Sequence, residues 1–120
     1  MRLVGKETFE RRYPEEGVEV EKQPLFYLRK ISVGEKASID DASFLTAGNN
    51  IKFLGGTSQR LKLKYGIADW KNITDDSNNA VPCNDENKEK LPMGVAIWLV
   101  NEIDKLNGLN VVIKEEERKK

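Results

Sequence analysis

The spacing that comes closest to known chemistry begins at the acidic residue Asp75. Counting from Asp75, the oxygen-bearing residues at positions three, five and twelve of a helix-loop-helix calcium loop are Ser77, Asn79 and Glu86. Two residues disagree with a calcium site, because Ala80 stands where the sharp turn requires glycine and Pro82 takes the short-strand position. We therefore favour a turn held by hydrogen bonds to the Asp75 side chain, and we expect neither a metal nor another cofactor.

Cys83 is the only cysteine, and its neighbours do not favour catalysis. A reactive thiolate needs a base or a positive charge nearby, but Asp85 and Glu86 follow it closely in the sequence. Carboxylates raise the pKa of a thiol. The chain also contains no histidine, which excludes histidine-based acid–base catalysis and histidine-ligated zinc. We therefore expect a protein that is not an enzyme.

The charge balance argues against two classes of partner. The 120 residues include 20 Lys and Arg and 20 Asp and Glu, so the formal net charge is zero. Nucleic-acid binders depend on an excess of basic residues, and a membrane span needs roughly 18 apolar residues in a row. The basic line formed by Lys52, Arg60, Lys62 and Lys64 fits a lysine-protected edge strand better than a phosphate-binding face. We expect no nucleic acid and no membrane as a partner.

The first half of the chain predicts a strand followed by a capped helix. Residues 25–31 are rich in aromatic and branched side chains, which are typical of strands. Ser32 and Glu35 have the spacing of a capping box, in which each side chain bonds the other's backbone N–H. The helix should run from Val33 to about Leu45 and end at residues 47–50. Its predicted buried stripe consists of Val33, Ala37 and Phe44.

Two structures compete for residues 51–65. Apolar and basic side chains alternate in 51–54 and again in 60–65, with a glycine pair between them, which predicts a β-hairpin. Leucine, lysine and arginine are also good helix formers, so a helix over 58–65 is the alternative. We favour the hairpin.

Gly66 and Trp70 follow this segment, and both point to packing. A glycine at this place suits either a positive φ or a close approach of another element. A tryptophan after such a turn usually anchors the loop in the core, with its N–H bonded to a carbonyl. We therefore expect Trp70 to be structural.

The last helix carries more apolar side chains than one face requires. It should begin at Pro92, which suits the first turn, and end at residues 107–108. One stripe spans an arc of about 80° on the helical wheel and consists of Val95, Leu99, Ile103 and Leu106. A second line contains Met93, Ile97 and Val100, with Trp98 on the other flank. Either another segment of this chain or another subunit covers the second line. We predict a partner interface formed by Met93, Ile97, Trp98 and Val100.

The whole pattern predicts a single compact α+β domain with a small antiparallel sheet and two main helices. Residues 1–24 are an N-terminal arm, in which Val18 and Val20 alternate with glutamates and allow a short edge strand; a mobile arm is the alternative. The domain covers residues 25–113, where 111–113 form a short strand or pack back on the domain. Residues 114–120 are a charged tail.

Several short motifs occur in an order that packing alone does not require. They are Leu28 and Ile31 before Gly34-Glu35, then Tyr65-Gly66-Ile67, Trp70, Asn72, the turn 75–79, the Leu91-Pro92 helix with Trp98-Leu99 and Glu102-Ile103, and the ending 116–119. In this order they resemble small proteins from the tail-assembly gene region of tailed bacteriophages, in particular tail assembly chaperone-like proteins and other tail-region accessory proteins. One departure is Asn78-Asn79, where the family pattern would have Asp-Gly.

The resemblance implies a non-enzymatic phage or prophage morphogenesis protein in the host bacterial cytoplasm. Such chaperones coat the tape-measure protein, keep it soluble, and leave as tube subunits polymerise. The implied partner is a phage structural protein, either the tape-measure or the tail tube protein, and a second copy of the chain is a further candidate. The alternative is a virion component, such as a head–tail or tail-end connector subunit, that remains in the particle.

Overall fold

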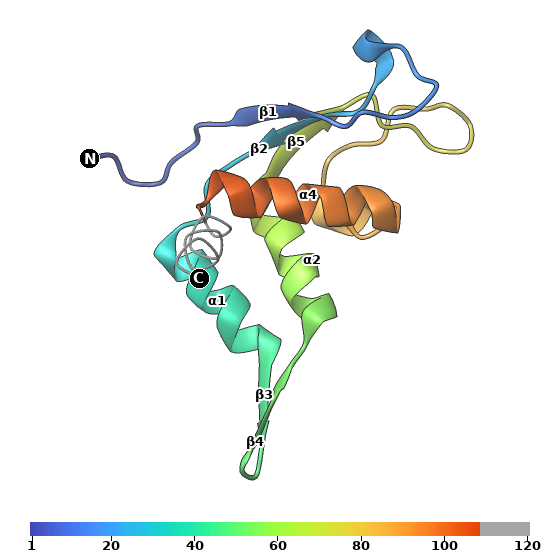
Figure 1. Cartoon of the computed structure of the whole chain (residues 1–120). Helices are drawn as coiled ribbons and strands as arrows, with labels where there is room; N and C mark the ends of the chain where they lie inside the picture. The colour runs from blue at the N-terminus through green and yellow to red at the C-terminus, as the bar shows by residue number, and fades with distance from the viewer. Residues whose placement is uncertain (109–120) are drawn as a thin grey trace, which may run out of the picture.

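The computed structural model describes residues 1–108, arranged as shown in Figure 1. The elements in chain order are β1 (Phe9–Arg12), the 3-10 turn η1 (Val20–Lys22), β2 (Leu25–Leu28), α1 (Val33–Ser43), β3 (Phe44–Ala47), β4 (Asn50–Phe53), α2 (Gly55–Gly66), β5 (Ile67–Lys71), α3 (Asp85–Lys88) and α4 (Met93–Leu106). One sheet has the strand order β1-β2-β5 and the other is the hairpin β3-β4, both antiparallel. The predicted α+β class is confirmed.

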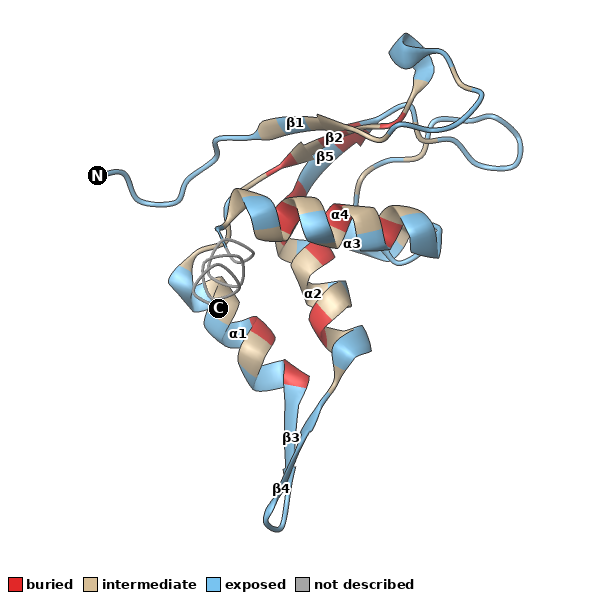
Figure 2. Ribbon diagram, viewed as in Figure 1, coloured by how far each residue is buried: buried red, intermediate tan, exposed pale blue. Residues whose placement is uncertain are grey.

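The core lies between the three-stranded sheet and α4 (Figure 2). Phe26 and Leu28 alternate along the central strand β2, so they share one face, and both are fully buried. Ile67 and Trp70 of β5 join them. The α4 residues buried in this core are Ala96, Leu99 and Ile103, with Val95 and Leu106 packed at its edge. The predicted main stripe of the last helix is therefore confirmed.

Trp70 is anchored as the sequence predicts. Its ring is buried and meets Phe26 edge-on, with centroids 6.2 Å apart. Its indole N–H donates to the Val81 carbonyl at 2.7 Å. This bond fixes the long loop after β5 to the core, because a buried indole N–H needs a partner.

The start of α1 confirms the capping box. Ser32 Oγ accepts from the Glu35 N–H at 3.2 Å, and Glu35 Oε1 accepts from the Ser32 N–H at 3.0 Å. The predicted buried stripe of this helix is wrong, because Ile39 and Ser43 are the buried residues. The side chains expected there, which are exposed instead, are Val33, Ala37 and Phe44. The helix ends at Ser43, which places Phe44 in a strand.

The hairpin predicted over residues 51–65 is wrong, and the alternative helix is present as α2. Strand β4 pairs with β3 instead, from Phe44 opposite Phe53 to Ala47 opposite Asn50. Residues 47–50, expected to end a helix, form the turn of this hairpin. Gly48 has φ 62°, which suits a two-residue turn with glycine first. Alternating leucine and lysine fits either structure, and α2 prevails by burying Leu63 in the core.

The N-terminal segment contributes a strand that the sequence does not predict. β1 pairs with β2, so part of the expected arm belongs to the sheet. The edge strand expected at Val18 and Val20 is wrong, because the 3-10 turn η1 begins at Val20. Backbone and side-chain bonds close this loop, including Tyr13 N–H to the Pro24 carbonyl at 2.9 Å. Gln23 Nε2 adds a bond to the Val18 carbonyl at 3.1 Å.

The last described residues close the domain against the start of α1. The Asn107 Oδ1 accepts from the Ile31 N–H at 2.8 Å. The strand predicted at 111–113 and the tail predicted at 114–120 lie outside the described residues. Among residues 1–108, no helix combines the length and apolar character needed to cross a bilayer.

Candidate functional site

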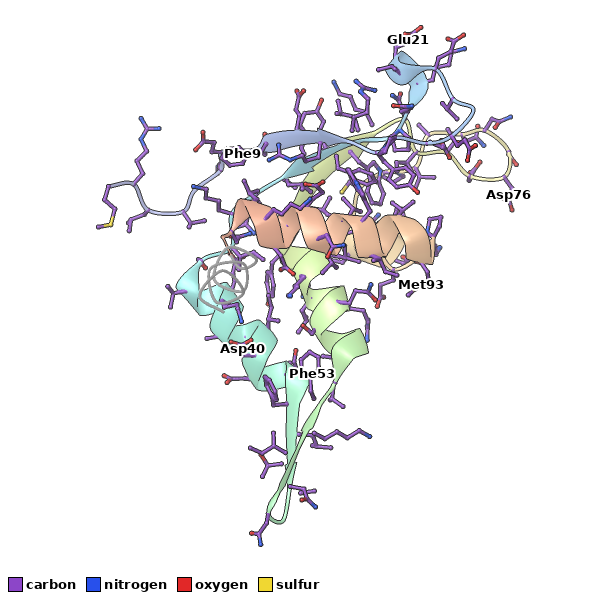
Figure 3. All side chains as sticks on the ribbon, viewed as in Figure 1. Phe9, Glu21, Asp40, Phe53, Asp76 and Met93 are labelled. Carbon is purple, nitrogen blue, oxygen red and sulfur yellow. The ribbon has the colours of Figure 1, made fainter. Side chains whose placement is uncertain are left out.

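The second apolar line of α4 is partly open to solvent in the described part of the chain. Met93 is 63% exposed and Ile97 is 51% exposed, while Val100 is half-buried and packs against the core of its own chain. Met93 lies at the start of the helix (Figure 3). We call Met93, Ile97 and Val100 the α4 line. Solvent-exposed apolar side chains at helical spacing form a surface that a second helix or sheet can cover.

Trp98 does not belong to this line. Its ring packs inside the domain, edge-on to Tyr13 with centroids 5.3 Å apart, and 6.4 Å from the Phe26 ring. Tyr13 comes from the segment after β1, whose position the sequence does not indicate. Part of this ring is therefore covered within the chain, and the place of Trp98 in a partner interface stays a prediction.

The hairpin β3-β4 is a second apolar feature, and the sequence analysis missed it. It projects from between α1 and α2, away from the sheet and α4 (Figure 1), and all eight strand residues are exposed. Cross-strand partners share a face, so Phe44 and Phe53 lie on the same side as Thr46 and Ile51. The two phenyl rings are 5.2 Å apart. We call Phe44, Ile51 and Phe53 the hairpin face.

The local sequence could have indicated this hairpin. Gly48-Asn49 is a two-residue turn signal between two short runs rich in aromatic and branched residues. Gly48 also fits the end of a helix, and the sequence analysis assigns it to that role. The local pattern does not indicate that the hairpin stays a separate two-stranded sheet among the described residues.

A depression joins the hairpin face to the α4 line. Its volume is about 330 Å³, and its walls include Phe53, Ile97 and Val100. Gly55 and Ser58 at the start of α2 also line it. Short side chains at these α2 positions leave room between the hairpin and α4. Together, the hairpin face and the α4 line form what we call the apolar surface.

Charges around the depression are paired. Lys62 also lines it, and its Nζ lies 3.1 Å from Asp104 Oδ1 across the contact between α2 and α4. Arg60 pairs with Glu89, the residue that follows α3. The predicted basic line is therefore not a continuous stripe, because Lys52 lies on the projecting hairpin while two other members have carboxylate partners. This arrangement does not provide a groove for a phosphate backbone.

The acidic turn forms the predicted side-chain-bonded structure. Asp75 Oδ1 accepts from the Ser77 N–H at 2.9 Å and from the Asn79 N–H at 3.0 Å. Glu86, the twelfth position of the hypothetical calcium loop, lies on α3 within 3.7 Å of Lys90. Within residues 1–108, no three His, Cys, Asp or Glu side chains are grouped as a metal site would need.

Cys83 is half-buried at the edge of the core. Burial raises the pKa of its thiol above the ordinary value; Lys88 opposes the shift, and Asp69 and Asp85 add to it. The neutral thiol is a poor nucleophile, so this environment does the reverse of what thiolate catalysis requires.

Lys88 is a buried cation that the sequence analysis did not single out. Its Nζ donates to the Lys64 carbonyl at 3.0 Å and to the Ile67 carbonyl at 2.9 Å, and it lies 3.5 Å from Asp85. These carbonyls are at the C-terminal end of α2, where the helix leaves acceptors unpaired and where a positive charge is favoured. Lys88 therefore docks α3 onto α2.

No family model, curated protein or solved structure matches this chain significantly. Two features of the chain bear on its function, namely the apolar surface and the order of motifs that resembles phage tail-region proteins. Neither the half-buried thiol nor the acidic turn adds a competing reactive site.

Proposed function

We propose that this protein is a non-enzymatic phage or prophage morphogenesis protein, similar to tail assembly chaperones, that acts in the host bacterial cytoplasm. It binds an apolar segment of a phage structural protein, either the tape-measure or the tail tube protein. The observation that supports this proposal is the exposed Met93 and Ile97 of α4, beside a depression that Phe53, Ile97 and Val100 help to line. A soluble chaperone needs such a surface on an otherwise neutral body, because its client would aggregate through the same kind of side chains.

The shape of the surface suits a helix. Met93, Ile97 and Val100 are spaced by four and three residues, so they form a ridge along one side of α4. An amphipathic client helix can place its own apolar residues against this ridge and into the depression. Asn101 and Gln59 also line the depression and supply polar groups. This mode requires no fixed client sequence, which is appropriate for a long tape-measure protein.

The test is a binding titration with helical segments of a phage tape-measure protein. Ile97→Asp places a charge in the contact and should weaken binding at least tenfold, or about 1.4 kcal/mol. Lys105→Gln is a matched control, because it makes the same change in net charge on an exposed position of α4. Binding that is equal in both variants would refute the proposed surface.

The second candidate is a connector subunit that stays in the virion. The projecting hairpin favours this candidate, since an arm that leaves the body can reach a neighbouring subunit in a ring (Figure 1). Mass spectrometry of purified particles separates the two functions. A chaperone should be absent from particles, whereas a connector should be present in a copy number that matches a ring.

A further inference from the structure

The apolar surface exposes an area that a second molecule can cover. Five of its side chains expose about half of their area or more: Phe44, Ile51, Phe53, Met93 and Ile97. At roughly 100 Å² each they present about 500 Å², at the upper end of what monomers expose. Two such surfaces in contact would bury about 1,000 Å², which is the minimum for a specific interface.

The two halves of the surface are suited to each other. The hairpin face projects, and the α4 line is beside a depression. Phe53 belongs to both, because it is part of the hairpin face and also lines the depression. The hairpin points away from its own α4 (Figure 1), so it is available to another molecule. A two-stranded hairpin with no covering layer is only marginally stable by itself.

Charge does not oppose this contact. The hairpin face carries no charged residue, because Lys52 points to the opposite side of β4 from Ile51 and Phe53. In the depression, Lys62 is paired with Asp104. The formal net charge of the chain is zero, so two copies do not repel each other.

We infer that the apolar surface is covered by a second copy of this chain, with the hairpin face of each copy on the α4 line of the other. A two-fold axis near Phe53 generates both contacts at once, since each half meets its complement. Ile51, the most exposed residue of the hairpin face at 73%, enters the depression beside Ile97 of the second copy. This inference does not depend on the proposed function. Where both hold, the second copy and the phage partner compete for the α4 line.

The test measures the mass of the purified full-length protein by light scattering at about 100 µM, above the micromolar range of weak dimers. The wild type should have twice its 13.7 kDa chain mass. Ile51→Asp should raise the dimer Kd at least tenfold, while Asn50→Asp should not. Asn50 is the neighbouring residue on the opposite face of β4, so this control adds the same charge to the same strand. Circular dichroism confirms that both variants are folded.

Mixed disulfide formation tests the geometry. In a Cys83→Ala background, Ile51→Cys protein mixed with Ile97→Cys protein should form a covalent pair containing one chain of each kind. A monomeric wild type would overturn the inference. The surface would then be covered by a client or by another part of the same chain. A dimer insensitive to Ile51→Asp, or one in which Ile51→Cys links only to itself, would also overturn it. Loss of tape-measure binding with an intact dimer would count against the proposed function alone.

Discussion

A side chain at Gly66 would collide with Ile103. A Cβ at residue 66 would lie 2.6 Å from the Ile103 Cδ1, 2.9 Å from its Cγ1 and 3.0 Å from its Cγ2. Both residues are buried, and the φ of Gly66 is not positive. Of the two reasons offered for a glycine here, close packing is therefore the correct one. This contact lets the end of α2 meet α4 directly under the three-stranded sheet.

Gly66→Ala should destabilise the protein by about 1–3 kcal/mol, because overpacking a buried contact forces side chains from their preferred rotamers. Urea unfolding of the variant measures this loss. Gly56→Ala is the control within the same helix, since a Cβ there meets nothing within 4 Å. It should be neutral or stabilise by up to about 1 kcal/mol.

A double-mutant cycle shows whether Ile103 is the cause. Ile103→Val removes the Cδ1 methyl and should cost about 0.5–1.5 kcal/mol in the wild type. In the Gly66→Ala background the same change should cost less, because it removes the Cδ1 methyl, which makes the shortest of the three contacts. Strictly additive effects would contradict this explanation.

Glu35 should make stability depend on pH. Burial raises the pKa of this carboxyl, but hydrogen bonds from Arg29 and Ser32 outweigh it, so the pKa is lowered from 4.5. Arg29 Nη1 donates to Glu35 Oε2 at 2.9 Å and also bonds the Tyr65 carbonyl. Because the folded pKa is the lower one, this stabilisation is complete above the unfolded pKa. It is lost as the pH falls through the folded pKa.

Glu35→Gln should therefore be about 1–2 kcal/mol less stable than the wild type at neutral pH, since it loses the ion pair and weakens the cap. Urea unfolding across a pH series checks this. The difference in unfolding free energy between the wild type and Glu35→Gln should shrink on acidification below the ordinary glutamate pKa of 4.5. A difference in unfolding free energy that stays constant down to strongly acidic pH would show that the carboxylate charge does not stabilise the fold.

Cys83 should react slowly with thiol reagents in the native protein. Burial holds its pKa above 9.0, so at mildly alkaline pH less thiolate is present than in an ordinary cysteine. The rate of disulfide exchange with an aromatic disulfide reagent at fixed pH measures this, with the urea-unfolded chain as reference. A native rate equal to or above the unfolded rate would indicate an activated thiol.

The turn at Asp75 should hold without calcium. Its carboxylate already accepts two backbone N–H groups, so isothermal titration with calcium should show no binding heat. Asp75→Ala should cost about 0.5–1.5 kcal/mol, as expected for a lost side-chain cap. Saturable calcium binding that disappears in Asp75→Ala would reverse this interpretation.

The sequence was most informative where structure depends on near neighbours. The capping box of Ser32 and Glu35 and the main stripe of α4 follow from residues three or four positions apart, and both predictions are confirmed. The errors in the segment 44–65 have two causes. Gly48 fits a helix end as well as a hairpin turn, and the leucine–lysine alternation of residues 60–65 is typical of a strand although these residues belong to α2. The choice there depends on long-range burial of Leu63 against the sheet and α4.

In the candidate site, too, features that depend on near neighbours could be predicted, and features that depend on distant residues could not. The spacing predicts the α4 line and places Trp98 on the other flank, but it does not indicate that Tyr13, from the segment after β1, packs against the Trp98 ring. Lys88 binds carbonyls 21 and 24 residues earlier in the chain. No local pattern indicates such partners, because any lysine near a helix carries the same sequence signal.

The central claim is that the α4 line and the depression beside it hold a phage structural protein in solution. Its most direct test is the soluble fraction of a phage tape-measure protein when both proteins are expressed together. We expect the wild type and Lys105→Gln to keep the tape measure soluble, and Ile97→Asp to leave it in the pellet. A tape measure whose solubility is the same with the wild type, with Ile97→Asp and without this protein would contradict the claim.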